Sequence, residues 1–520
     1  MAIQVVLVQR RYTIPAVLRN LTQITRMEPI SQEIPAAPPT SAELDASLVR
    51  GIAWVGAARW STQALTWIAT LLIARVLSPA DYGIFSMALL YLGLLALVTE
   101  FGLGAAIVTI RNLSGRQVAQ LNTVSVILGL AGFALTCAAA IPLGYFFHSP
   151  ELPAVLMVMA LGFVISSFQS VPSALLQKDL RYKLISIIEL AKTTGTALVM
   201  LPLAFLGARY WTLVAGSLVG SLIATGLTLA RKRHGFAMPD LDDLGHAIKY
   251  SWQVLIGRIG WYTYSNSDFL VAGRVLGPVI LGYYTLAWNL ATMPIDKITT
   301  LVSSVTPGIY SAAQGDFSAL KRYLLKPTEV LSILLFPVMA GLALVSKDAV
   351  LVLLGAKWQS AILPLELLSI YACIRSIMPL FGQILMVTGD SRYVMWTNVT
   401  SAVLFPIAFF VGSRWGALGI ASTWVLIYPI NAIPLYRRVT KRINLTNTEY
   451  FHALWPGLHG TIVMVIGVLI LKILLAKTQL PIVSLSIQVA GGVLFYVATM
   501  LLFHRTRVGI LTRVLSFLRS

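Results

Sequence analysis

Apolar runs long enough to cross a lipid bilayer follow one another at short intervals from residue 48 to near the end of the chain. A membrane-spanning helix needs about 20 consecutive, mostly apolar residues. The runs predict fourteen spans, near residues 50–74, 82–100, 120–141, 153–172, 184–206, 211–230, 247–271, 280–304, 326–346, 361–386, 394–412, 416–436, 457–476 and 482–503. Only 11% of the residues are charged, whereas a soluble domain has roughly 25%. The sequence therefore predicts an all-α polytopic membrane protein and excludes a soluble enzyme.

The distribution of basic residues predicts the orientation of these spans. The formal net charge is +19, and in membrane proteins such an excess collects in cytoplasmic loops. If both termini are cytoplasmic, the links on the cytoplasmic side carry more than twice as many lysines and arginines as the links on the other side. We therefore predict cytoplasmic termini, and the positive charge requires no nucleic-acid partner.

Residues 1–47 differ in composition from the rest of the chain. Four prolines between residues 29 and 39 disfavour a helix in the second half of this segment. We predict a disordered cytoplasmic tail. Met27 could start an equally sensible protein, so the sequence leaves open whether residues 1–26 belong to the native chain.

Part of the sequence recurs at an offset of 199 residues. The identical positions include Arg59/Arg258, Arg75/Arg274, Pro79/Pro278 and Gly83/Gly282. Six predicted spans separate the two copies, so the first helix of each copy crosses the membrane in the same direction. The chain is therefore predicted to form one lobe over residues 48–235 and a second lobe over 236–440. Two further helices and a basic cytoplasmic C-terminus occupy residues 441–520.

Two parallel six-helix lobes related by a pseudo-two-fold axis are a known transporter plan, in which the substrate lies between the halves. An alternative is that the lobes only record a gene duplication and enclose no pathway. Polar residues inside the first helix of each lobe favour a pathway.

Each lobe carries an arginine inside its first predicted helix, Arg59 and Arg258. A charged side chain at membrane depth costs roughly 2.5–3.5 kcal/mol on insertion scales and normally faces a water-filled cavity or a partner. We predict a central cavity lined by other residues of the same helices, namely Gln63, Thr66, Trp261, Tyr262, Tyr264, Ser265 and Asp268. Because arginine binds phosphate or carboxylate through two parallel hydrogen bonds, the predicted cargo is an anion. The alternative is that each arginine snorkels to the membrane interface or pairs locally, Arg258 with Asp268.

Carboxylates inside other spans could couple transport to an ion gradient. The candidates are Glu189, Asp296 and Glu366. Glu189 and Lys192, three residues apart on one helix, could instead neutralise each other. The chain has two cysteines and neither an HExxH nor a GxxxxGK[ST] motif, so no metal site is predicted. No cofactor is predicted either, apart from a proton or sodium gradient.

Several stretches of the chain carry a resemblance to a known family. They include residues 75–83 (RVLSPADYG), 101–106 (FGLGAA), 172–183 (PSALLQKDLRYK) and 281–287 (LGYYTLA), followed by Pro307, Gln314, Asp316, Gly355, Trp358 and residues 388–390 (TGD). In this order they resemble the polysaccharide transporters, or Wzx-type flippases, of the multidrug/oligosaccharidyl-lipid/polysaccharide exporter superfamily. The resemblance covers about residues 48–440.

The resemblance implies a flippase of the bacterial inner membrane rather than an enzyme. Its cargo would be an undecaprenyl-diphosphate-linked oligosaccharide, moved from the cytoplasmic to the periplasmic leaflet by alternating access for exopolysaccharide or lipopolysaccharide biosynthesis. Its partners would be a periplasmic polymerase and chain-length or export proteins. Arg59 and Arg258 would bind the diphosphate, and Arg274 and Arg75, at the outer ends of the lobes, are further candidates.

Two other functions stay open. The first is a cation-coupled small-molecule exporter of the same superfamily, against which a cationic cavity argues. The second is a non-transporting membrane component of a polysaccharide assembly, which would be favoured if Arg59 and Arg258 were dispensable for polymer production. The sequence identifies neither the sugar unit, nor the coupling ion, nor the oligomeric state.

Overall fold

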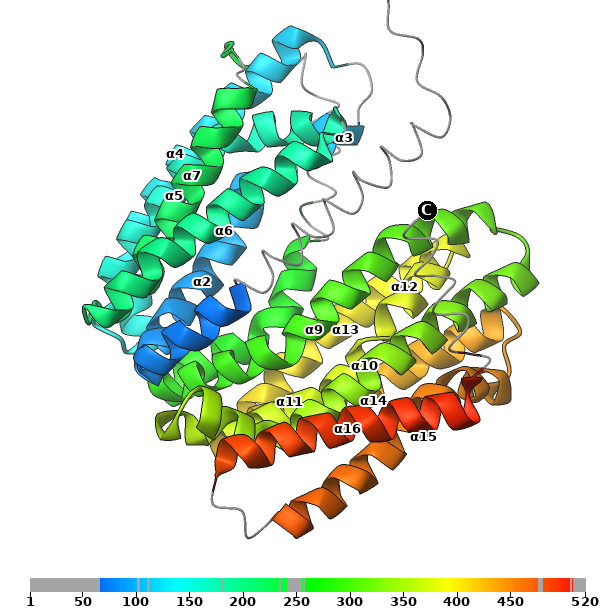
Figure 1. The fold of residues 1–520 in the computed structure, drawn as a ribbon. Helices are drawn as coiled ribbons and strands as arrows, with labels where there is room; N and C mark the ends of the chain where they lie inside the picture. The colour runs from blue at the N-terminus through cyan, green and yellow to red at the C-terminus, as the bar shows by residue number, and fades with distance from the viewer. Residues whose placement is uncertain are drawn as a thin grey trace, which may run out of the picture. The chain divides into compact units, whose positions relative to one another are not determined.

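The computed structural model describes residues 66–100, 103–109, 113–179, 181–232, 235–240, 255, 258–475, 480–505 and 507. Every regular element in this part of the chain is helical (Figure 1). The long helices after the apolar helix Thr66–Val76 are α2 (Pro79–Glu100), α4 (Gly115–Phe147), α5 (Leu152–Lys178), α6 (Tyr182–Phe205), α7 (Trp211–Arg231), a helix over 258–271, α9 (Gly277–Ala312), α10 (Phe317–Leu353), α13 (Ser391–Gly412), α14 (Gly416–Arg442), α15 (Asn447–Leu474) and α16 (Pro481–Phe503). The shorter elements are α3 (Leu103–Thr109), the π-helical turn η1 (Ala272–Leu276), η2 (Ala356–Ala361), α11 (Ile362–Arg375), α12 (Met378–Val387) and η3 (Ser413–Trp415). The predicted tail, Arg59 and Gln63 lie outside the described residues.

Eleven helical stretches among the described residues are long and apolar enough to cross a membrane. Two of them, Arg258–Asp296 and Ser391–Arg442, are interrupted inside and hold two crossings each. Each of the two contains a glycine with positive φ, Gly277 at 80° and Gly416 at 66°. Glycine adopts positive φ readily, and at both positions this geometry interrupts the helical path of the backbone.

The chain folds back at both glycines. Sixteen residues of straight helix would separate Asp268 from Tyr284 by about 24 Å, yet the Tyr284 hydroxyl donates a 2.6 Å hydrogen bond to the Asp268 carboxylate. Beyond Gly416, α14 packs against α13. With these turns and the helix Thr66–Val76, each predicted span has a helical counterpart, although the first and seventh are described only in part. The predicted all-α polytopic fold is confirmed, and its count of fourteen helices is approximate.

The helices group into two lobes and a terminal pair (Figure 1). In the first lobe, from the helix Thr66–Val76 to α7, α5 packs against α2, α4 and α7. In the second lobe, from residue 258 to α14, α11 packs against α9, α10 and α14. The helices α15 and α16 pack against each other and against α10. This grouping agrees with two helical lobes followed by two C-terminal helices.

The two lobes meet in a reciprocal contact between α2 and α9. A Cβ atom on Gly83 would lie 1.7 Å from the carbonyl oxygen of Pro278, and a Cβ atom on Gly282 would lie 1.8 Å from that of Pro79. The two prolines are equivalent in the repeat, as are the two glycines, so the contact has two-fold symmetry. It confirms the pseudo-two-fold relation of the lobes. We call this end of the helices the Pro79 end and the opposite end, where α2 stops at Glu100, the Glu100 end.

A second pair of equivalent positions extends the reciprocal contact. The indole Nε1 of Trp358, a fully buried side chain in η2, donates a 2.8 Å hydrogen bond to the carbonyl of Ala74 in the other lobe. Gly273 is the repeat equivalent of Ala74, and it packs against the ring of Phe147, which also lies in the other lobe. The end of the first helix of each lobe therefore contacts the other lobe.

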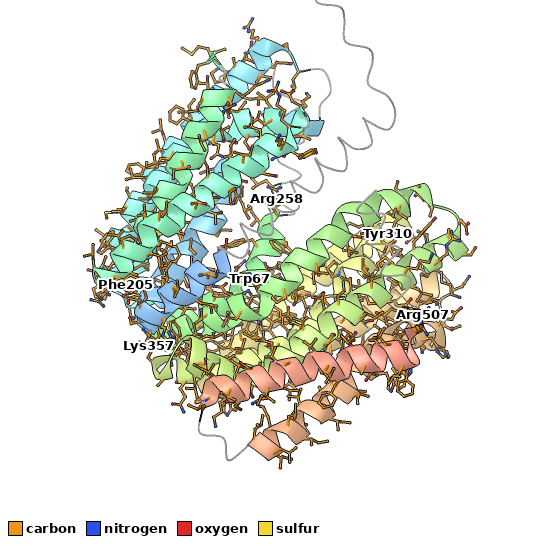
Figure 2. All side chains as sticks on the ribbon, viewed as in Figure 1. Trp67, Phe205, Arg258, Tyr310, Lys357 and Arg507 are labelled. Carbon is orange, nitrogen blue, oxygen red and sulfur yellow. The ribbon has the colours of Figure 1, made fainter. Side chains whose placement is uncertain are left out.

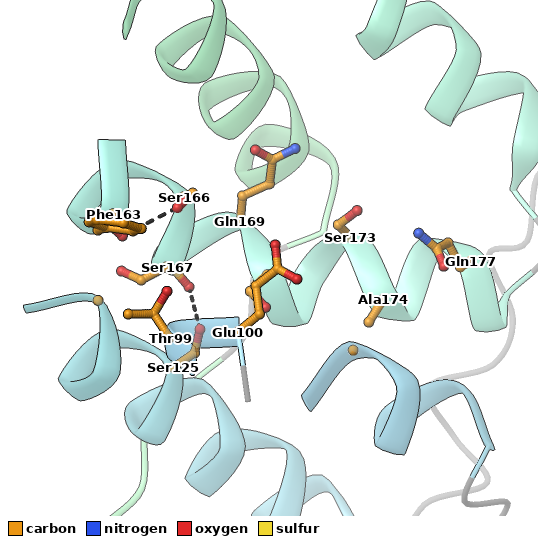
Figure 3. Close-up of a pocket in the computed structure, with 13 residues that line it drawn as sticks. Thr99, Glu100, Ser125, Phe163, Ser166, Ser167, Gln169, Ser173, Ala174 and Gln177 are labelled. Carbon is orange, nitrogen blue, oxygen red and sulfur yellow. Dashed lines mark hydrogen bonds between the residues drawn. The ribbon is translucent and has the colours of Figure 1, made fainter. Parts of the chain in front are cut away.

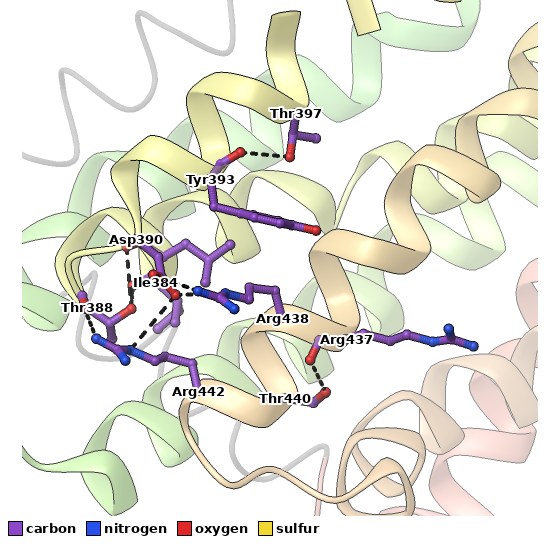
Figure 4. A network of polar contacts seen from close by, with 10 residues as sticks. Ile384, Thr388, Asp390, Tyr393, Thr397, Arg437, Arg438, Thr440 and Arg442 are labelled. Carbon is purple, nitrogen blue, oxygen red and sulfur yellow. Dashed lines mark hydrogen bonds and ion pairs between the residues drawn. The ribbon is translucent and has the colours of Figure 1, made fainter. Parts of the chain in front are cut away.

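A polar network fixes the turn between α12 and α13 to the end of α14 (Figure 4). Arg438 donates hydrogen bonds of 3.0 and 3.1 Å to the Asp390 carboxylate, and its guanidinium lies over the ring of Tyr393. Arg442 donates a 2.6 Å hydrogen bond to the carbonyl of Thr388. The hydrogen bond from Arg438 lowers the pKa of Asp390, so the carboxylate stays ionised into the mildly acidic range. These arginines therefore have a structural role at this turn.

Candidate functional site

Arg258, a predicted anion-binding residue, lies at the Glu100 end (Figure 2). Its Nη1 atom lies 3.7 Å from Oε2 of Glu100 in the first lobe. The alternative pairing with Asp268 is therefore wrong. The Arg258 side chain is 48% exposed and that of Glu100 is 61% exposed, and an exposed ion pair contributes only about 0–1 kcal/mol. This ion pair therefore contributes little to the stability of the lobe contact.

Arg274 and Arg75 lie at the Pro79 end, where each contacts the other lobe. The Nη1 atom of Arg274 lies 2.6 and 2.8 Å from the two ring nitrogens of His148. Arg75 donates a 3.4 Å hydrogen bond to the carbonyl of Val352. Sixteen residues of helix, about 24 Å, separate Arg274 from Arg258. The structure therefore does not bring these two arginines into one site with Arg258.

The helix over 258–271 carries most of the residues that the sequence predicts to line a cavity. Its exposed side chains include Arg258 and Trp261, the latter 57% exposed. The Ser265 hydroxyl donates a 2.8 Å hydrogen bond to the carbonyl of Trp261 in the same helix. Thr66, half-buried, begins the described part of the first helix. A ligand could thus reach Arg258 and Trp261 directly.

Two tyrosines of the same helix are packing residues. The Tyr262 hydroxyl donates a 2.9 Å hydrogen bond to the carbonyl of Leu90 in α2. Gly93 makes room for it, since a Cβ atom there would lie 2.4 Å from the Tyr262 oxygen. The Tyr264 ring packs edge-on against Trp424 in its own lobe. Tyr262 thus joins the lobes and Tyr264 stabilises the second one.

Asp268 is fully buried inside the second lobe. One carboxylate oxygen, Oδ2, accepts hydrogen bonds from the Tyr284 hydroxyl (2.6 Å) and the Trp424 indole (3.0 Å). The other, Oδ1, has no hydrogen-bond partner among the described residues. The rings of Trp288 and Tyr371 pack against Trp424. An ionised carboxylate in these surroundings is costly, and a proton or a bound cation would offset that cost.

The three carboxylates that the sequence nominates for ion coupling all have polar partners. Glu189 forms an ion pair with Lys192 (3.5 Å), and Asp296 forms one with Arg375 (3.6 Å). Glu366 accepts a hydrogen bond from the Ser346 hydroxyl (2.8 Å). Glu189 and Lys192 form the ion pair that their spacing on one helix allows. Compared with these three, Asp268 is the more deeply buried acid, and its network is a feature that the sequence analysis missed.

A family model described as polysaccharide biosynthesis protein matches residues 72–363. The match covers more than half of the chain. It includes both glycines and both prolines of the reciprocal contact, and it also includes Arg258 and Asp268. The chain belongs to this family. The matched residues lie in both lobes, so the match does not depend on one local motif.

This polysaccharide biosynthesis protein has relatives of nearly its own length. It is similar to the lipopolysaccharide biosynthesis protein WzxC of Escherichia coli (strain K12), with 27% identity over 417 residues that cover 77% of this chain and 84% of WzxC. It is also similar to the succinoglycan biosynthesis transport protein ExoT of Rhizobium meliloti (strain 1021), with 24% identity over 488 residues that cover 91% of this chain and 96% of ExoT.

Among solved structures, the lipid II flippase MurJ in an inward closed conformation aligns with a TM-score of 0.69. The alignment covers 88% of this chain and 99% of MurJ, at 14% sequence identity. At this identity the likeness shows a shared fold alone. This chain and MurJ therefore share a helical fold over nearly the whole length of MurJ.

Proposed function

We propose that this polysaccharide biosynthesis protein is a flippase and not an enzyme. Its cargo would be an undecaprenyl-diphosphate-linked oligosaccharide, moved between leaflets for exopolysaccharide or lipopolysaccharide biosynthesis. The names of WzxC and ExoT support the pathway and the transport role. The observation that supports it most is the reciprocal contact of α2 and α9, because alternating access requires two similar lobes that rock against each other around a central site.

We further propose that the Pro79 end faces the periplasm and the Glu100 end the cytoplasm of a bacterial inner membrane, with both termini cytoplasmic. The excess of basic residues in links at the Glu100 end supports this orientation. The lobe boundaries would fall after residues 235 and 440. A periplasmic polymerase and chain-length or export proteins would receive the flipped unit.

Arg258 is the proposed diphosphate ligand, together with its repeat equivalent Arg59. Its ion pair with Glu100 is long and exposed, so it exchanges readily for a phosphate. Arg75 and Arg274 hold the lobes together at the Pro79 end in this state. They would become available to the diphosphate once that end opens.

The flippase proposal predicts a specific transport defect. The purified protein is reconstituted in liposomes with a lipid-diphosphate oligosaccharide, and an added glycosidase reports over time which glycans have crossed. We expect transport by the unmodified protein and a rate at least about tenfold lower in the double variant Arg59→Gln/Arg258→Gln. A charge-assisted hydrogen bond contributes about 1.5–3 kcal/mol, which supports a change of this size.

Arg414→Gln is the matched control, because Arg414 is exposed and makes no ion pair with any residue that the structure describes. It should transport normally. Transport that survives the double substitution would keep the flippase and remove the arginine site. Absence of transport in the unmodified protein, with and without a proton or sodium gradient, would favour the exporter or the non-transporting alternative.

We also propose that an ion gradient acts through Asp268. Asparagine at this position can still accept the hydrogen bonds from Tyr284 and Trp424, but it can neither carry a negative charge nor release a proton. In Asp268→Asn, the transport rate in the presence of a gradient should fall to the rate without one. Glu366→Gln, which changes a carboxylate bonded to Ser346, should leave the response intact. An undiminished response in Asp268→Asn would contradict the proposal.

A further inference from the structure

A polar cavity of about 280 Å³ lies inside the first lobe at the Glu100 end, among α2, α3, α4 and α5 (Figure 3). Hydroxyl and amide side chains make up most of its wall, with one carboxylate, Glu100, and one aromatic ring, Phe163. None of the described residues that line it is basic. The wall therefore differs in chemistry from Arg258, the arginine that Glu100 contacts from the other lobe.

Three polar side chains on α5 face this cavity without a partner. Ser170, Ser173 and Gln177 recur at intervals of three and four residues, so they share one face of the helix, and all three line the cavity. None of them makes a hydrogen bond to a residue in the described part of the chain. Because Ser170 and Ser173 are half-buried and Gln177 is exposed, their polar groups are open to hydrogen bonds from a ligand that enters the cavity.

The wall distinguishes between the parts of a lipid-linked oligosaccharide. A diphosphate would find no cation in the wall, and a lipid tail would leave the polar groups without hydrogen bonds. A sugar ring offers several hydroxyl groups, each a donor and an acceptor, and an apolar face that can pack on Phe163. The cavity volume lies near the lower end of the roughly 300–1,000 Å³ typical of small-molecule sites, which suits a single ring.

The position of Glu100 relates this cavity to the proposed diphosphate ligand. Glu100 lines the cavity, and it is also the residue that lies 3.7 Å from Arg258. A group held in the cavity would thus be the immediate neighbour of a diphosphate held by Arg258. In an undecaprenyl-diphosphate oligosaccharide, that neighbour is the sugar attached directly to the diphosphate.

We propose that this cavity binds the first sugar ring of the cargo, and that this ring is neutral rather than a uronic acid, whose carboxylate Glu100 would repel. The proposal rests on the flippase function stated above. Arrival of the cargo exchanges the ion pair, because the phosphate takes Arg258 while Glu100 accepts hydrogen bonds from sugar hydroxyls. The second lobe thus recognises the charge of the cargo, and the first lobe recognises its first sugar.

Binding measurements on the full-length protein in lipid nanodiscs test this proposal. The probes are a polyprenyl diphosphate without sugar, the same lipid with one glucose or one galactose, and the same lipid with one glucuronic acid. We expect the unmodified protein to bind at least one neutral-hexose probe about tenfold more tightly than the sugar-free probe. The glucuronic acid probe should bind no more tightly than the sugar-free probe.

Variants of the cavity wall provide the second part of this binding test. Ser170→Leu/Ser173→Leu fills the cavity without removing a hydrogen bond, and should abolish the preference for the neutral hexose while preserving affinity for the sugar-free probe. Gln177→Ala, a truncation of an exposed side chain, should lower the preference without risk to folding. Ser186→Leu is the matched control, because Ser186 is a half-buried serine on α6 outside the cavity, and it should change neither affinity.

Equal binding of the hexose and sugar-free probes by the unmodified protein would overturn the sugar site and leave the flippase standing. Tighter binding of the glucuronic acid probe would overturn it as well, and so would a preference that survives both the filled cavity and Gln177→Ala. If no probe binds, the flippase proposal fails and the sugar site fails with it.

Discussion

Alanine at both Gly83 and Gly282 is expected to force α2 away from α9 and to abolish transport. The two new Cβ atoms would lie 1.7 and 1.8 Å from proline carbonyl oxygens, and these neighbours are backbone atoms that cannot rotate aside. Overpacking typically costs about 1–3 kcal/mol at each site. The midpoint of thermal unfolding in detergent should fall. The distance between spin labels on the exposed equivalent positions 76 and 275, at the Pro79 end, should increase.

Gly226→Ala is the matched control for this prediction. Gly226 is a helical glycine in α7 with no atom within 4 Å of its ideal Cβ position. Replacing glycine by alanine at such a site stabilises a protein by about 0.4–1 kcal/mol, so this variant should unfold at the same temperature or higher. A Gly83→Ala/Gly282→Ala protein as stable and as active as Gly226→Ala would refute the reciprocal contact.

Truncation of Trp358 should be the most destabilising single substitution in the loop after α10. Trp358 is fully buried between the ring of Tyr82 in one lobe and that of Tyr283 in the other. Trp358→Ala should cost about 3–5 kcal/mol, because it removes a large buried side chain and leaves a cavity. Trp358→Phe keeps most of the packing and loses the hydrogen bond to Ala74, so we expect a cost of about 1 kcal/mol from that bond.

Chemical unfolding of both variants in detergent measures this difference. Trp396→Ala is the control, because Trp396 on α13 is 55% exposed and its loss should change stability by about 0.5 kcal/mol or less. If Trp358→Ala were no more destabilising than Trp396→Ala, the lobes would not depend on this side chain. Loss of transport in Trp358→Phe at normal stability would show that the hydrogen bond to Ala74 contributes to the motion itself.

The sequence predicted the features that depend on local patterns. Apolar runs determine where helices cross, since a span is a local property of about 20 residues, and the repeat at an offset of 199 residues revealed the two lobes. The same repeat gave both glycines and both prolines of the reciprocal contact. It could not show that each glycine meets the proline of the other copy, because that pairing depends on the docking of α2 against α9.

The partners of the charged residues could not be predicted in the same way. Asp268 bonds to Tyr284 after a reversal of the chain and to Trp424 on a helix 156 residues away. Arg258 pairs with Glu100 in the other lobe, whereas its own helix offered Asp268 as the obvious partner. Sequence spacing identifies neighbours on one helix, but in this fold the decisive neighbours lie on other helices.

The symmetry of the reciprocal contact also bears on the ancestry of the fold. In each lobe a proline carbonyl occupies the space that the missing side chain of a glycine in the other lobe leaves free. Each lobe is therefore complementary to a copy of itself. A single six-helix chain with these four positions could therefore have assembled as a homodimer through the same contact. Fusion of two such copies would remove the dependence of assembly on protein concentration. It would also allow the two halves to diverge, one keeping Ala74 where the other has Gly273.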